Sequence, residues 1–124
     1  MYSLRSDFYE IPDKLIDGWP AALEALCVTL EIACIKPLAS VSVTQGMVRR
    51  RGCTLEVAVS FRPTGKHILA VSAILPRGSR SVPADVAALL DEVGAALEHA
   101  GAKRITSLAE YLTQERAAMR SKRG

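Results

Sequence analysis

The sequence predicts an α+β fold with an antiparallel meander of three or four strands and two or three helices packed on one face. Residues 54–61 alternate strictly between large apolar side chains and polar or small ones, which is typical of a half-buried strand. Residues 81–101 instead repeat apolar side chains at helical spacing. Because 124 residues suffice for one hydrophobic core, we expect a single domain over residues 1–124.

The chain begins with an aromatic segment, residues 1–19. It holds four of the six aromatic side chains, Tyr2, Phe8, Tyr9 and Trp19. Loose alternation over residues 2–11 predicts an extended arm or an edge strand. Since each aromatic ring buries a large area when it packs, we expect this arm to be held against the core of its own domain, with another subunit as the alternative.

A helix is predicted next, beginning at Pro20, because proline suits the first helical position. Four residues then recur at helical spacing: Leu23, Leu26, Leu30 and Cys34. Pro37 ends the pattern. The β-branched content of residues 27–35 leaves a strand as the alternative. In the favoured helix, Val28 and Ile35 share a face with acidic residues and are exposed unless the arm or a partner covers them.

Three strands follow the predicted helix. Residues 54–61 direct every second side chain into the core, and residues 68–75 read as a second strand that is small or apolar on both faces. Residues 41–47 predict a third strand with a possible bulge at Gly46. The segments Arg49–Gly52 and Arg62–Lys66 have the composition of turns.

The C-terminal part predicts two helices. Residues 81–101 form the first, with Gly101 at its C-terminal cap. Its core stripe is Val86, Leu89, Leu90, Val93 and Leu97. Ser107 and Glu110 have the spacing of a capping box and predict the start of the second helix. That helix ends in a polar basic tail, residues 116–124.

Charge is segregated along the chain. Residues 36–80 contain eight basic residues and one acid, Glu56, whereas the first 31 residues contain six acids and two bases. A concentrated basic face attracts an anionic partner. We therefore expect this to be a small binding or regulatory protein that contacts nucleic-acid phosphates or an acidic protein surface. The expected contact residues are Arg49, Arg50, Arg51, Arg62, Lys66, Arg77 and Arg80.

The three consecutive arginines, Arg49–Arg51, are expected at a hairpin tip, where alternation would direct Arg50 to the side opposite Arg49 and Arg51. A solvated turn that protects a sheet edge is the alternative role for them. The basic block contains one aromatic ring, Phe61, which is in phase with the core positions of its strand. Nucleic-acid contacts would therefore be made to phosphates, with little base stacking.

A second hypothesis is a protein–protein adaptor or inhibitor that acts through apolar surface, with a homodimer as one form of it. Its expected contact residues are Val28, Ile35, Phe8, Tyr9 and Trp19. A small enzyme is the third hypothesis and the least favoured, because the sequence shows no nucleophile motif and no glycine-rich phosphate loop. We expect no catalytic residues.

No cofactor, metal or small-molecule ligand is expected. The three cysteines are widely spaced, and neither His67 nor His99 has a ligand-type residue three or four positions away. An odd number of cysteines without a disulfide framework favours a reducing compartment. The N-terminal residues lack the pattern of a signal peptide, and no apolar run approaches the length of a membrane span. We therefore expect a cytoplasmic protein.

Overall fold

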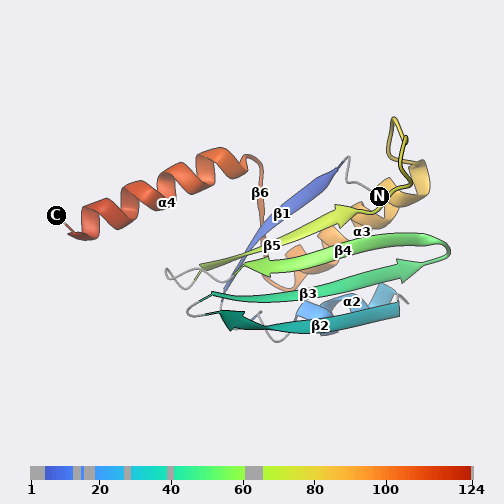
Figure 1. Ribbon diagram of the computed structural model, residues 1–124, viewed down its shortest axis with the longest axis horizontal. Helices are drawn as coiled ribbons and strands as arrows, with labels where there is room; N and C mark the ends of the chain where they lie inside the picture. Colours follow the sequence, from blue (N-terminus) through green and yellow to red (C-terminus); the bar gives the residue numbers. More distant parts are fainter. Residues whose placement is uncertain are drawn as a thin grey trace.

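Six strands form one antiparallel sheet in the computed structural model, which describes residues 5–12, 15, 19–26, 29–38, 41–60 and 66–123. The strands are β1 (Ser6–Pro12), β2 (Thr29–Leu38), β3 (Val41–Arg50), β4 (Cys53–Ser60), β5 (Lys66–Ala73) and β6 (Lys103–Ile105). Their order across the sheet is β2-β3-β4-β5-β1-β6 (Figure 1). The predicted α+β class with an antiparallel sheet is confirmed, and the sheet is wider than the three or four strands expected.

The extra width comes partly from the two ends of the chain. β1 was expected as an arm or an edge strand, yet it lies inside the sheet, between β5 and β6. Tyr9 pairs with Leu69 on one side and with Arg104 on the other. The sequence does not indicate β6, because three residues are too few for an alternating pattern to be recognised.

The helix predicted from Pro20 to Ile35 is wrong. The structure has a short helix α2 (Trp19–Leu23) and a single turn of 3-10 helix, η1 (Glu24–Leu26), and then β2 pairs with β3 over Thr29–Leu38. The β-branched residues of this segment fit a pleated strand better than a helix, where their side chains crowd the preceding turn. The pairing register shifts between Ile35 and Leu38, around Pro37. Proline lacks a backbone donor and is tolerated there because β2 is an edge strand.

β3 continues without interruption through Gly46. This residue pairs with Ile32 on one side and with Val57 on the other, so the expected bulge is absent from the described ladder. β3 and β4 are joined by the two residues Arg51 and Gly52. Both have positive φ, +48° and +83°, as in the mirror-image turns that suit the twist of a hairpin.

Helix α3 (Ala84–His99) follows the prediction closely. All five residues of its expected core stripe are buried. Its C-terminal end is a Schellman motif, in which the Ala102 amide donates to the Leu97 carbonyl and the Gly101 amide to the Glu98 carbonyl. Gly101 has φ +116°, a conformation that glycine adopts without a side-chain clash. The chain then turns directly into β6.

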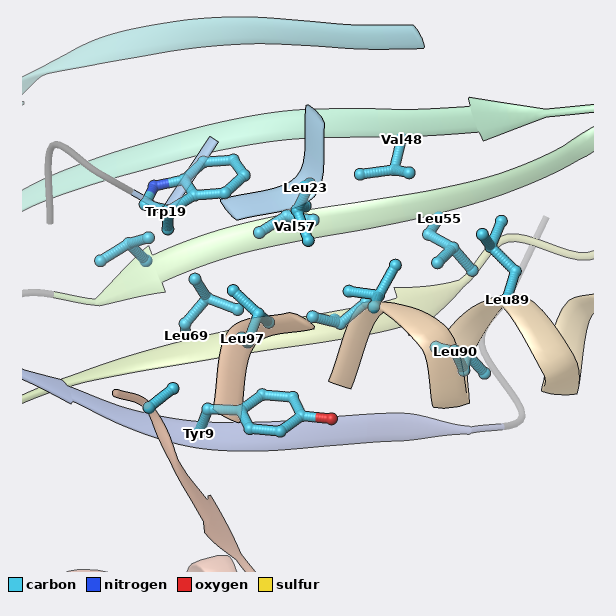
Figure 2. Close-up of a cluster of buried hydrophobic side chains, with 14 of the residues drawn as sticks. Tyr9, Trp19, Leu23, Val48, Leu55, Val57, Leu69, Leu89, Leu90 and Leu97 are labelled. Atoms are coloured by element: carbon cyan, nitrogen blue, oxygen red, sulfur yellow. The ribbon is translucent and has the colours of Figure 1, made fainter. Parts of the chain in front are cut away.

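The core lies between the sheet and the helices α2 and α3. Tyr9 from β1, Trp19 from α2 and Leu97 from α3 are at most 1% exposed and meet side chains of β4 and β5 (Figure 2). The sheet supplies Leu55, Val57, Val59, Leu69 and Val71 to this cluster. In Figure 1 both helices lie behind the sheet, and the face toward the viewer carries none of the described helices.

Helix α4 (Leu108–Arg123) behaves differently from α3. It begins at the predicted capping box, where the Glu110 amide donates to Ser107 Oγ at 3.3 Å. From there it leads away from the sheet, past β6 (Figure 1). The helix includes residues 116–123, which were expected as a polar tail. No described helix is long and apolar enough to cross a membrane.

Candidate functional site

The basic residues predicted from the sequence are divided between the two ends of the sheet. The β3–β4 turn and the end of β5 lie at the same end, because Leu55 pairs with Ala73. Lys66 begins β5 at the opposite end, about 24 Å away over seven residue steps of an extended strand. Arg62 lies outside the described residues. Lys66 therefore cannot share a compact contact with the arginines of the β3–β4 turn.

At the β3–β4 turn, the three arginines diverge. Arg49 pairs with Thr54 and lies on the helix-free face, where its Nη2 atom is 4.0 Å from Met47 Sδ. Arg50 takes the opposite face and forms an ion pair with Glu92 of α3. Its Nη1 atom also donates to the Leu26 carbonyl of η1 at 3.5 Å. Arg50 thus holds the hairpin against the helical layer.

Arg51 occupies the tip of the hairpin. It is exposed, and its φ of +48° makes it the one described non-glycine residue in the left-handed region. Asparagine, aspartate or glycine is usual in this turn position. A side chain that tolerates the left-handed region poorly costs on the order of 1–3 kcal/mol there, and such residues concentrate at functional sites. Arg51 also forms no ion pair with any residue that the structure describes.

Two more arginines come from the connection between β5 and α3, which starts at the same end. The Ile74 amide donates to the Thr54 carbonyl at 3.1 Å and fixes the start of this connection beside β4. A tight turn follows, in which Ser79 donates through its amide and its hydroxyl to the Pro76 carbonyl. Arg77 lies within this turn and Arg80 follows it, and both are exposed. Neither forms an ion pair within the described part of the chain.

Two carboxylates of α3, those of Asp91 and Glu92, are engaged by Arg5 and Arg50. Arg5 donates to Asp91 Oδ1 at 2.8 Å and to Asp7 Oδ2 at 3.0 Å, which joins β1 to α3. The hydrogen bond to Asp7 is the main cause that raises the Arg5 pKa above its usual value, followed by the bond to Asp91. Because Glu92 is bound to Arg50, two of the α3 carboxylates do not neutralise the loop arginines.

A hollow of about 780 Å³ lies between the hairpin tip, α3 and η1. The hairpin contributes Arg49, Arg50 and Arg51 to its wall, and α3 contributes Asp85 and Glu92. Arg50 and Glu92 of this wall are paired with each other, and the wall also holds Asp85. We name the group Arg49, Arg51, Arg77 and Arg80 the arginine end of the sheet.

The two acids in the wall of the hollow have no signal in the sequence. Asp85 and Glu92 are more than thirty residues from the hairpin and are spaced as ordinary solvent-facing positions of a helix. Arg5 was not among the expected site residues either, because an isolated arginine near a terminus carries no pattern. These groups meet through the packing of α3 on the sheet, which linear spacing does not encode.

The residues expected at an apolar contact are scattered. Tyr9 is fully buried and Trp19 is 1% exposed, so neither presents surface to a partner. Phe8 is half-buried on the helix-free face of the sheet, where it pairs with Ala70. Ile35 belongs to the edge strand β2. Val28 lies outside the described residues.

Metal-binding and nucleophilic groups do not converge in the described part of the chain. No three histidine, cysteine, aspartate or glutamate residues there are placed to hold a metal ion. His67 is buried in β5, whereas His99 ends α3 on the surface. Cys53 is a half-buried free thiol in the wall of the hollow.

Comparison with known protein families and with curated proteins finds no match to this chain. The candidate site is therefore interpreted from its own residues and geometry.

Proposed function

We propose that this protein is a non-enzymatic binding protein whose arginine end docks on phosphates of a nucleic acid. The observation that supports this most is the convergence of two loops that are distant in sequence. The β3–β4 turn and the β5–α3 connection bring four exposed arginines to one end of the sheet. Arginine presents a planar array of donors that matches phosphate geometry and is weakly hydrated, so it binds phosphate well at an exposed surface.

The placement of the acids strengthens this proposal. Arg5 and Arg50 pair with Asp91 and Glu92, so these two carboxylates of α3 are already neutralised. The described arginine end has no aromatic ring, and base stacking needs one. Contacts to backbone phosphates carry little sequence information. We therefore expect duplex binding that depends strongly on salt and weakly on sequence.

The test is a salt titration of binding to random-sequence duplex DNA and RNA, followed by fluorescence anisotropy. With three or four phosphate contacts, the logarithm of the association constant falls against the logarithm of salt with a slope of roughly −3 to −4. The triple variant Arg51→Ala/Arg77→Ala/Arg80→Ala should lose most of this binding and most of the slope. Circular dichroism checks that the variant remains folded.

A matched control removes the same charge elsewhere. Lys66 and Lys103 are also exposed, and their double replacement by alanine lowers the net charge as much as Arg77→Ala/Arg80→Ala does. If these two double variants bind equally weakly, overall charge and not the arginine end is responsible. If the wild type does not bind at about 50 mM salt, where electrostatic contacts are strong, the nucleic-acid proposal is wrong, and an acidic protein surface becomes the partner to test.

A further inference from the structure

The helix-free face of the sheet carries two adjacent rows with apolar and small residues. In the first row Ile105, Phe8, Ala70 and Ala58 lie side by side across β6, β1, β5 and β4. In the second, Ile68 pairs with Ser60 on one side and with Glu10 on the other, and Ile68 is buried. Phe8, Ala58 and Ala70 are half-buried, and no described helix covers them. We name these two rows the open face.

Helix α4 carries a stripe that matches such a face. Leu108, Tyr111 and Leu112 recur three or four residues apart on one side of the helix, and Glu115 follows on the same side. Leu108, Tyr111 and Leu112 are half-buried, whereas Ala117 on the opposite side is exposed. Leu108 also borders a hollow of about 400 Å³ together with Phe8 and Ile105. The stripe therefore begins where the first apolar row ends.

The helix cannot turn back onto the open face of its own chain. Two residues, Thr106 and Ser107, separate β6 from α4. Ser107 fixes the direction of the helix through bonds from the Glu110 amide to its hydroxyl and from the Tyr111 amide to its carbonyl. With so short and so well fixed a connection, α4 leads away from the sheet (Figure 1).

The total exposed area is larger than that of a compact monomer. The chain exposes 7901 Å². A folded monomer of 13.4 kDa exposes roughly 6,500 Å² by the usual scaling of surface with mass. The chain is therefore less compact than an average monomer of its mass, with α4 leading away from the sheet (Figure 1).

We propose that the open face is covered by α4 of a second copy of this chain, in a symmetric dimer in which each α4 packs on the sheet of the other subunit. Each chain supplies both halves of the contact, because the side chains of the α4 stripe and those of the first row of the open face are only half-buried. The 16 residues of α4 are about 24 Å long, and six strands span about 24 Å.

Charge is also arranged for this contact. Glu56 of β4 is exposed and pairs with Met47 of β3 on the open-face side of the sheet. The C-terminal half of α4 carries Arg116, Arg120, Lys122 and Arg123. The basic helix end therefore has an acidic side chain to meet on the partner's sheet, which favours one direction of the helix across the face.

The test measures the mass of the full chain in solution by light scattering after size exclusion, over a range of concentrations. We expect a dimer, with twice the 13.4 kDa mass of the chain. Leu112→Glu places a charge in the stripe and should yield a monomer that unfolds as cooperatively as the wild type. Ala117→Glu adds the same charge on the opposite side of α4 and should remain a dimer.

A mixing experiment identifies the two halves of the contact. Ala58→Glu places a charge in the open face and should also yield a monomer. Each site of the symmetric dimer combines one helix with one face, so a mixture of Leu112→Glu and Ala58→Glu has one intact site per heterodimer. The mixture should therefore recover dimer that neither variant forms alone.

Two results would overturn the proposal. One is a wild-type protein that remains a monomer at every concentration reached. The other is a dimer that persists in both Leu112→Glu and Ala58→Glu, which would move the interface elsewhere, for example to the edge strand β2.

Discussion

At the scale of single residues, the closest fit in the core is between Tyr9 and Gly94. Tyr9 is fully buried, and among the described residues its hydroxyl has no hydrogen-bond partner. A Cβ atom at Gly94 would lie 2.4 Å from that hydroxyl oxygen and 3.4 Å from the ring carbon that bears it. Gly94 is therefore the residue that allows the tyrosine ring to lie against α3.

This contact predicts opposite effects of one substitution in two backgrounds. In the wild type, Gly94→Ala should lower the free energy of unfolding by about 1–3 kcal/mol, because the hydroxyl must move out of a packed site. In a Tyr9→Phe background the nearest atom is at an ordinary contact distance, and alanine is the better helix former by about 1 kcal/mol. There Gly94→Ala should be stabilising. Urea unfolding of the four proteins measures the coupling, and additive effects would contradict the contact.

Tyr9 also predicts how stability changes with pH. Burial raises the pKa of Tyr9 above 10, and the neighbouring Asp7 charge raises it further. Because the folded-state pKa lies above the unfolded value, the contribution of Tyr9 is complete below about pH 10 and is lost as the pH rises above that value. Tyr9→Phe removes this alkaline loss and also an unpaired buried hydroxyl.

We therefore expect Tyr9→Phe to be at least as stable as the wild type at pH 7 and clearly more stable at about pH 11. Unfolding by urea at the two pH values measures both effects. The two proteins share every other ionisable group, so the comparison isolates Tyr9. An equal loss of stability in the two proteins between pH 7 and pH 11 would show that ionisation of Tyr9 does not oppose folding.

At the scale of elements, the turn of the β3–β4 hairpin begins with Arg51, a residue that tolerates the left-handed backbone conformation poorly. Arg51 and Gly52 both have positive φ, and asparagine followed by glycine is the preferred pair in this turn. The same hairpin is held to the helices by Arg50. This ion pair is partly exposed to solvent and contributes little to stability. The turn and not the ion pair is thus the place where stability can be gained.

Arg51→Asn should stabilise the protein by about 1 kcal/mol, because asparagine tolerates the left-handed region better than arginine. Arg51→Ala is the matched control, since it removes the same charge without relieving the backbone. Thermal unfolding should rank the asparagine variant above the alanine variant, while both should bind nucleic acid more weakly than the wild type. A tie in stability between the two variants would contradict the strain at Arg51.

β2 is the element for which the sequence pattern was misleading. Its apolar residues fit a helical stripe as well as a strand. The strand forms because β3 offers a partner along its length, and pairing satisfies the backbone groups of residues that are poor helix formers. The local preferences for helix and for strand were nearly equal in this segment, and the pairing with β3 decided in favour of the strand.

At the scale of the whole molecule, two surfaces of different character lie apart. The arginine end is formed by loops at one end of the sheet, whereas the open face lies across the middle of its helix-free side. Electrostatic docking weakens with salt, and an apolar contact does not. Raising the salt concentration therefore separates the two proposals, because nucleic-acid binding should be lost while the dimer persists.

The sequence by itself determined the α+β class, strands at β3, β4 and β5, helix α3 with its core stripe and the capped start of α4. These elements were predictable because their periodicity, caps and turn residues are local features of consecutive side chains. It also identified Arg49, Arg51, Arg77 and Arg80 as basic residues on turns.

The tertiary structure alone decided which of those residues belong together. It separated Lys66 from the arginine end, assigned Arg50 to an ion pair with α3, and placed β1 and β6 side by side in one sheet. It also left one face of the sheet without a described helix over it and directed α4 away from the sheet. Such arrangements depend on contacts between residues that are far apart in the chain, and these follow from the packing of the whole domain.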